Sequence, residues 1–197
     1  MTWWFKARRI GPVLVPGLAV CLLLLALAHN WVIELPGLLS GSHNQIFLLY
    51  LLPVLPLSAL HLALTSRLTE AESTARRPLH LYDTALICCT VAVMTLGGVF
   101  IGLTSNSPEA WAFGRNALFM TGLMLLAHRV RADAAVVAPA GWVFVVMFLG
   151  FDRFRRPCFW AVLPHPPGHL FSLALATLVF AGGLAAFFSL RRTQQGT

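Results

Sequence analysis

The sequence predicts an all-α, polytopic membrane protein whose 197 residues form a single transmembrane domain. Hydrophobic residues make up 58% of the chain and charged residues only 11%, whereas soluble domains carry about 25% charged residues. The apolar residues gather into six long stretches, and Lys and Arg cluster beside alternate stretches. These observations predict six transmembrane helices with both termini in the cytoplasm, and they leave no soluble domain large enough for chemistry on its own.

Each apolar stretch has about the length that a helix needs to cross ~30 Å of hydrocarbon at ~1.5 Å per residue. Pro53 and Pro56 lie within the second stretch, so we expect a kink there. The alternating pattern of a barrel strand is absent, and an open sheet cannot cross a bilayer. The predicted spans are residues 11–28, 45–65, 84–103, 111–127, 134–151 and 169–190, of which the fourth and fifth are the shortest.

Basic residues set the predicted orientation, because cytoplasmic loops of membrane proteins are enriched in Lys and Arg. Segments 29–44 and 104–110 contain neither residue, which places them outside. The net charge of +7 is attributed to topology and lipid headgroups, and no nucleic acid partner is expected. The basic residues assigned to the cytoplasm are Lys6, Arg8, Arg9, Arg67, Arg76, Arg77, Arg129, Arg131, Arg191 and Arg192.

The connection after the fifth stretch breaks this rule. It should lie outside, yet it contains Arg153, Arg155 and Arg156. Either the topology differs near the end of the chain, or these arginines have a local task. An inside placement would put the basic C-terminus outside unless residues 158–166 re-enter the membrane. We prefer the arrangement with six spans.

The longest polar stretch covers residues 66–80, between the second and third spans. Glu70 and Glu72 would lie in the favourable first turn of a short helix capped by Ser66 or Thr69, and Pro78 would end it. Arg76 and Arg77 would occupy the last turn. One interpretation is a docking helix for a cytoplasmic partner. The other is a solvated linker that contains an interfacial helix.

Arg115 and Asn116 lie a few residues into the fourth span. A charge within a span costs about 2.5–3.5 kcal/mol at mid-membrane and less near the interface. Arg115 could face a transport pathway or pair with Glu109. Alternatively, its long side chain could extend to the outer headgroups, and on the sequence alone we favour that alternative.

The remaining polar residues predict no metal site, redox centre or nucleotide site. His61 has no second ligand at i+3 or i+4, and two prolines separate His165 from His169. Most of the cysteines are expected to be small packing residues within apolar runs. No Gly-rich loop with Lys-Ser or Lys-Thr is present, so any ATP hydrolysis would belong to another subunit.

Several motifs resemble those of the permease subunits of type-2 ABC exporters, especially the small, divergent permeases of actinobacteria. Arg67, Thr69, Glu70 and Pro78 are similar to a stretch in the coupling helix between spans two and three of that family. The other motifs are Gly114-Arg115-Asn116, Gly122-Leu123, Leu125-Leu126, Arg129 and Trp160-Ala161-Val162-Leu163-Pro164. The resemblance implies a coupling helix at residues 67–78 and a re-entrant outer hairpin at residues 157–168.

Two features depart from this family. The N-terminal amphipathic helix would be limited to Trp3-Trp4-Phe5-Lys6, and the arginines at 153, 155 and 156 are not expected there.

The resemblance implies a permease subunit in the bacterial plasma membrane that exports a substrate together with a second permease chain, identical or related. Separate ATPase subunits, which bind ATP and Mg²⁺, would dock on residues 67–78, and Arg115, Asn116, Arg153 and Trp160 would face the pathway or outer gate. A membrane-embedded accessory or immunity protein that acts by binding is the alternative. A membrane enzyme ranks last, because the acidic residues lie at the ends of the spans.

Overall fold

The computed structural model describes residues 10–28, 32–36, 43–66, 79–152, 154 and 156–195. Within these residues there are six α-helices and one two-stranded hairpin. The π-helical turn η1 (Ile10–Leu14) leads into α2 (Val15–Ala28), and the 3-10 turn η2 (Leu48–Tyr50) precedes α3. The remaining elements are β1 (Val32–Pro36), β2 (His43–Phe47), α3 (Val54–Thr65), α5 (Leu79–Ser105), α6 (Pro108–Val130), α7 (Ala134–Leu149) and α8 (Leu170–Gln195).

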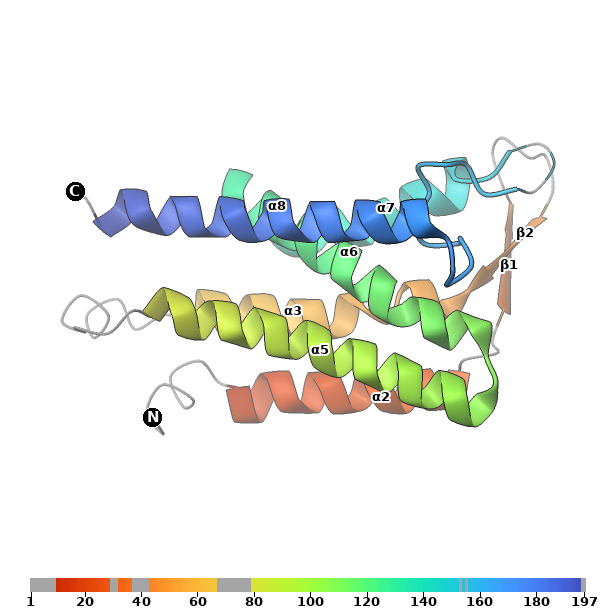
Figure 1. Cartoon of the computed structure of the whole chain (residues 1–197), viewed down its shortest axis with the longest axis horizontal. Coiled ribbons are helices and arrows are strands. Elements are labelled where there is room, and N and C mark those ends of the chain that lie inside the picture. Colours follow the sequence, from red (N-terminus) through yellow and green to blue (C-terminus); the bar gives the residue numbers. More distant parts are fainter. Residues whose placement is uncertain are drawn as a thin grey trace.

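The helices run side by side and reverse direction at each connection (Figure 1). The start of α2, the end of α3, the start of α5 and the end of α8 lie at the end of the bundle where both termini are marked. The hairpin, the α5–α6 turn and the segment between α7 and α8 lie at the opposite end. Helix α6 crosses the bundle, and its most extensive contacts are with α8, α5 and α7.

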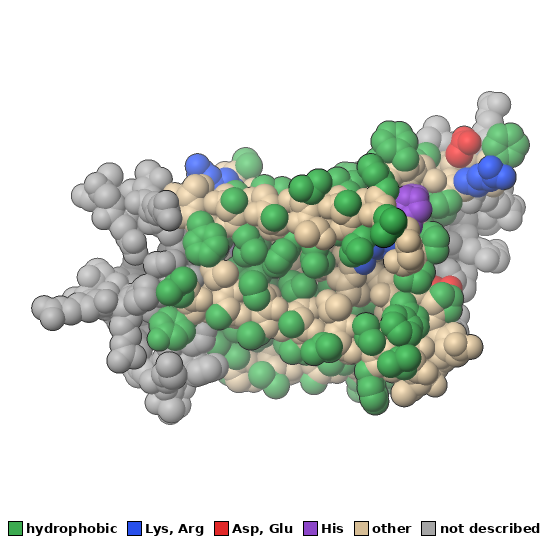
Figure 2. Space-filling view, in the orientation of Figure 1, with side chains coloured by type: hydrophobic (Ala, Val, Ile, Leu, Met, Phe, Trp, Pro, Cys, Tyr) green, Lys and Arg blue, Asp and Glu red, His purple; other side chains and the backbone are tan. Residues whose placement is uncertain are grey.

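Among the residues that the structure describes, three helices are long and apolar enough to cross a membrane: Ile10–Ala28, Leu81–Ser105 and Leu170–Ser189. Helices α3 and α7 are apolar but shorter. At ~1.5 Å per residue, α3 spans about 18 Å, well below the hydrocarbon thickness of ~30 Å. Hydrophobic side chains cover the visible face between the two ends (Figure 2). These features are consistent with a helical membrane protein.

The predicted second span, residues 45–65 with a kink, is only partly helical: β2, the turn η2 and α3 follow one another there. Gln45 lies in β2, where it pairs with Glu34 of β1 in an antiparallel register. Helix α3 begins only after Pro53, its N-cap residue, and Pro56 lies in its first turn. Proline lacks an N–H group, so it fits the first turn of a helix, whereas further inside it kinks or breaks the helix. The hairpin is also a departure from the predicted all-α fold.

The remaining helices lie close to the predicted spans because hydropathy is a local property of the chain. Helix α6 begins at Pro108, just after Ser107, whose hydroxyl oxygen accepts a hydrogen bond from the Ala110 N–H at 3.5 Å. Proline at the first helical position and a capping serine favour this start. Asn106 takes a left-handed conformation with φ of 53°, which allows the short turn from α5.

Helices α6 and α8 approach each other closely at Gly122 and Gly183. A Cβ atom on Gly183 would lie 2.7 Å from the carbonyl oxygen of Gly122, and a Cβ on Gly122 would lie 2.6 Å from the backbone nitrogen of Phe180. The neighbouring Gly182 faces open space. Only glycine fits at the two contact positions, so these residues set the distance between the helices.

Candidate functional site

Arg115 and Asn116 form a buried polar pair in α6, where they are 6% and 2% exposed. They lie about 10 Å along the helix from Pro108, at ~1.5 Å per residue. A buried charge is costly unless hydrogen bonds replace the water that it loses. The burial of Arg115 therefore requires hydrogen-bond partners within the protein.

Those partners come from the irregular segment 150–169 between α7 and α8. Its first part turns back on itself: the Asp152 N–H donates to the Arg156 carbonyl at 2.9 Å, and the Cys158 N–H donates to the Gly150 carbonyl at 2.8 Å. The chain then enters the end of the bundle, where Ala161, Val162 and Leu163 are almost fully buried. This is the region where the resemblance implies a hairpin.

The guanidinium group of Arg115 binds three backbone carbonyl oxygens of this segment. Nη1 donates to Pro166 at 2.9 Å, and Nη2 donates to His165 at 2.8 Å and to Leu163 at 3.1 Å. The Asn116 side-chain oxygen accepts from Nη2 at 3.1 Å and from Nε at 3.3 Å. The Asn116 amide in turn donates to Leu163 at 3.3 Å. The pair thus fastens the segment to α6.

Neither sequence-based interpretation of Arg115 describes this geometry. The guanidinium is buried among backbone carbonyl groups of the same chain. No salt bridge joins it to Glu109 among the side chains that the structure describes. Arg115 and Asn116 thus fix a segment at the end of the bundle.

His165 is the second polar group held by this arrangement. Its Nδ1 lies 2.6 Å from the carbonyl oxygen of Ala161, so Nδ1 carries the hydrogen and donates it. Its ring lies 4.2 Å from the ring of His169, measured between centroids. Burial lowers the pKa of His165 despite the opposing hydrogen bond to Ala161, and the neighbouring His169 and Arg115 lower it further. These influences favour the neutral imidazole.

His169 caps the helix that follows. Its Nδ1 accepts a hydrogen bond from the Ser172 N–H at 3.3 Å and lies 2.9 Å from the Ser172 hydroxyl. This satisfies one of the backbone donors left unpaired at a helix start. The two histidines therefore contact different backbone groups, and neither points to a metal site.

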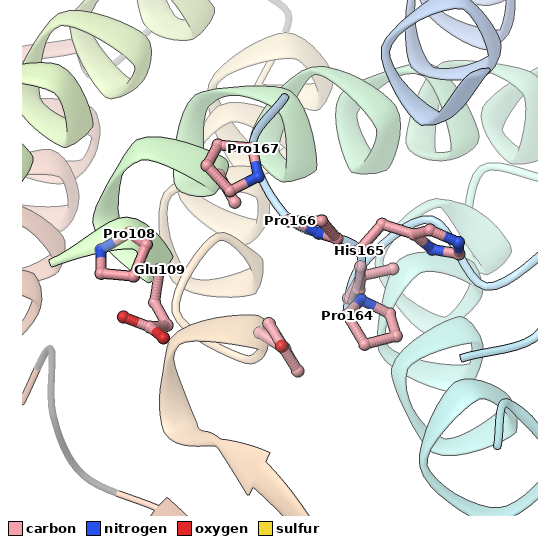
Figure 3. Close-up of a pocket in the computed structure, with 9 residues that line it drawn as sticks. Pro108, Glu109, Pro164, His165, Pro166 and Pro167 are labelled. Carbon is pink, nitrogen blue, oxygen red and sulfur yellow. The ribbon is translucent and has the colours of Figure 1, made fainter. Parts of the chain in front are cut away.

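A cavity of about 220 Å³ adjoins the carbonyl cluster at this end of the bundle. Figure 3 shows Pro108 and Glu109 at the start of α6 on one side and residues Pro164 to Pro167 on the other. Tyr50, Ala112 and Leu163 complete the lining. The Ser107 hydroxyl donates to the Glu109 carboxylate at 3.0 Å.

Comparison of the chain with known protein families, with curated proteins and with solved structures finds no match.

The structure brings together only part of the predicted site. Trp160 lies in segment 150–169 and packs edge-on against Trp142 of α7 at a centroid distance of 5.9 Å. It lies beside the buried segment that Arg115 holds. The predicted coupling residues Arg67, Thr69, Glu70, Glu72, Arg76, Arg77 and Pro78, and the predicted gate residue Arg153, lie outside the described residues.

Two further predictions concern His61 and the cysteines. The His61 ring lies 5.5 Å from that of His128 in α6, a neighbour that local spacing could not predict. No group of three or more metal-ligating side chains occurs in the part of the chain that the structure describes. Cys21 is buried as expected, whereas Cys88 and Cys89 are exposed on α5 and are not core packing residues.

The sequence reasoning missed His165 and the carbonyl groups of Leu163 and Pro166. One signal was available. Three prolines at positions 164, 166 and 167 leave neighbouring carbonyls without helical partners, because proline breaks regular hydrogen bonding. An arginine within an apolar helix needs such acceptors.

Proposed function

We propose that this chain is a transmembrane permease subunit of an ATP-driven ABC exporter in a bacterial plasma membrane. The supporting observation is the division of the bundle into two ends. Both described ends of the chain and both ends of the 67–78 connection share one end, and the segment held by Arg115 occupies the other. The family resemblance implies the same division, with the coupling helix at residues 67–78 at one end and the outer hairpin at residues 157–168 at the other.

The proposal assigns six membrane crossings to the six α-helices, with the shared end in the cytoplasm. The described arginines at that end, Arg129 and Arg131, are exposed, and Lys and Arg favour the cytoplasmic side. Helices α3 and α7 are short, so they would cross with help from the flanking segments η2 and 150–169. The bilayer also thins around short helices at modest cost.

The proposed mechanism is alternating access driven by partner ATPases. ATP and Mg²⁺ bind in those subunits, which dock on residues 67–78. Their closure would move α3 and α5, the helices joined by that connection. Because α6 packs extensively on α5 and holds segment 161–167 through Arg115, movement of α5 would reach the outer end of the bundle. A second permease chain, identical or related, would complete the pathway.

One observation favours the alternative, a membrane-embedded accessory or immunity protein that acts by binding. The interior between the helices is packed with apolar side chains in two large clusters. The cavity described above lies at one end of the bundle and involves the ends of elements only. A binding protein needs no path through its centre. Identifying the proteins that co-purify with this chain therefore decides between the two functions.

The test is co-purification with an ATPase. The tagged chain is expressed in its native host and extracted in mild detergent, and the chains that co-purify with it are identified. The proposal expects a stable complex that is lost in a variant carrying Arg76→Glu and Arg77→Glu. The matched control carries Arg129→Glu and Arg131→Glu, which make the same charge change at the same end. Absence of any complex with the wild-type chain, or equal loss in both variants, would overturn the proposal.

A further inference from the structure

The stretch 150–158 forms a hairpin whose base is anchored in the bundle. Two backbone hydrogen bonds close it, as described above, and Phe151 and Pro157 face each other across an antiparallel bridge. The Phe151 side chain is 9% exposed and belongs to the apolar core. The core therefore holds the base of the hairpin in place.

The tip of this hairpin and the residue just after it expose two aromatic rings. The side chain of Phe154 is 79% exposed and that of Phe159 is 74% exposed. In Figure 2, hydrophobic, basic and acidic side chains lie close together at the upper right of the molecule, the end that holds segment 150–169. Large apolar side chains of interfacial segments enter the boundary between lipid headgroups and acyl chains. These two rings are placed to do the same.

The same stretch carries a positive charge. Its sequence contains three arginines and one aspartate, which give it a net charge of +2. The Arg156 side chain is exposed, and among the described residues its guanidinium makes no hydrogen bond or ion pair. A guanidinium matches the geometry of a phosphate and binds it through parallel hydrogen bonds. Unlike Arg115, Arg156 can therefore bind a ligand outside the chain.

The helices on either side place this hairpin at the edge of the hydrocarbon layer. Helix α7 ends at Leu149, which is 41% exposed, and the apolar span of α8 begins at Leu170, which is 79% exposed. In a membrane, these exposed leucines lie where the acyl chains end. A hairpin that follows directly after such a helix end lies at the depth of the lipid headgroups, which water still reaches.

We propose that this hairpin, together with Phe159, is a binding surface for anionic phospholipids of the phosphatidylglycerol class. Arg156 donates hydrogen bonds to the lipid phosphate, and Phe154 and Phe159 contact the glycerol and the first methylene groups. Zwitterionic lipids bind less well, because their ammonium group offsets the charge of the phosphate. This inference requires a membrane around the chain but no ATPase.

An acidic protein is the other occupant whose charge would match this surface. A stable protein interface takes about 800 Å² and 20–30 residues from each partner. The surface proposed here consists of one short hairpin and the residue after it, which is much smaller. The size of the surface therefore favours a lipid headgroup.

The test measures which lipids surround the hairpin. The full-length chain carries Phe159→Cys in a background without the native cysteines, and bimane on this cysteine replaces one aromatic group by another. The protein is reconstituted into vesicles with equal amounts of phosphatidylglycerol and phosphatidylcholine, one of which carries bromine atoms that quench nearby bimane. We expect brominated phosphatidylglycerol to quench at least about twofold more strongly. One arginine at an anionic surface strengthens binding by about fivefold, or ~1 kcal/mol.

Three variants and a salt series assign this preference to the hairpin. Arg156→Gln should lower the quenching ratio toward one, because it removes the guanidinium. Arg129→Gln removes an exposed arginine at the other end of the bundle and should leave the ratio unchanged. Phe154→Ser should weaken quenching by both lipids alike. Sodium chloride at about 1 M should lower the ratio, because it shortens the screening length to ~3 Å.

Equal quenching by the two lipids, or a ratio that neither Arg156→Gln nor salt reduces, would overturn the inference. So would the absence of quenching, because the hairpin would then lie away from the bilayer and an acidic protein would be the better occupant. If Arg156→Gln does not fold, the salt series on the unchanged hairpin decides. None of these outcomes affects the co-purification test of the proposed function.

Discussion

At the scale of single residues, Arg115 shows how an apolar bundle accommodates a buried charge. Its partners are backbone carbonyls and one side-chain amide, all neutral. The arginine guanidinium carries five N–H donors in one plane, so it can bind several acceptors at once. The compact lysine ammonium cannot do this. The identity of the residue, and not only its charge, therefore matters.

We expect Arg115→Lys to destabilise the protein by about 1.5–3 kcal/mol, the usual value of a hydrogen bond to a charged group. The ammonium would reach some of the carbonyls and leave the others buried without a donor. Detergent-solubilised protein unfolded with denaturant gives the free energy of unfolding. Arg129→Lys, at an exposed position near the end of α6, is the matched control. Equal stability of the two variants would contradict the role assigned to Arg115.

His165 leads to a prediction about pH. Because its pKa is lowered in the folded protein, the unfolded chain binds a proton first as the pH falls below about 6.5. Stability should therefore be full above that pH and decrease below it. The charged and titratable groups around this imidazole are His169, Arg115 and Glu109.

We expect the melting temperature to fall between pH 7.5 and 5.5, and to fall less in His165→Asn. The asparagine side chain keeps an N–H group for the Ala161 carbonyl but does not titrate. His169→Asn serves as the comparison, since His169 is the nearest other imidazole. An unchanged pH dependence in His165→Asn would show that another group is responsible.

At the scale of elements, the contact between α6 and α8 depends on two glycines. Of the two adjacent glycines in α8, Gly183 approaches the backbone of α6 closely, whereas Gly182 meets open space. The two residues are adjacent in sequence but point in different directions, since successive residues in a helix differ by about 100°.

The adjacent glycines give a matched pair of variants. Gly183→Ala should destabilise the protein by about 1–3 kcal/mol, because the new methyl group would overlap the Gly122 backbone. Gly182→Ala should be neutral or stabilising by up to ~1 kcal/mol, because alanine favours the helix and meets open space. Denaturant unfolding of both variants in the same detergent provides the measurement. Equal destabilisation would contradict the close approach of α6 and α8.

At the scale of the whole molecule, the alternation of helix directions separates the two ends of the bundle. Segment 150–169 lies at the end of the bundle opposite to the start of α2 and the end of α8 (Figure 1), and its sequence contains three arginines. Arg156 is exposed there.

Labelling of single cysteines in a background without the four native cysteines tests this orientation. Phe154 is 79% exposed in segment 150–169, and Ala132 is exposed in the α6–α7 turn. A membrane-impermeant maleimide should label Phe154→Cys in intact cells and Ala132→Cys only after permeabilisation. The reverse pattern would invert the proposed topology, and labelling of both from one side would exclude the alternation.

The sequence by itself determined where most helices lie and which residues are unusual. Five of the six predicted spans overlap almost completely with α2, α5, α6, α7 and α8, because hydropathy and helix length are local properties. Arg115 and Gly183 could be singled out for the same reason: a charge or a glycine in an apolar helix is visible in the sequence. The late start of α3 was missed, although Pro53 and Pro56 marked it.

Only the tertiary structure decided what these residues contact. Arg115 meets Leu163, His165 and Pro166, which lie 48 to 51 positions away along the chain. His61 meets His128, and Gly183 but not Gly182 meets another helix. Such pairings depend on how helices rotate and cross, which the packing of the whole bundle determines. Hydropathy places each helix in the chain, but it does not specify which face of a helix meets which neighbour.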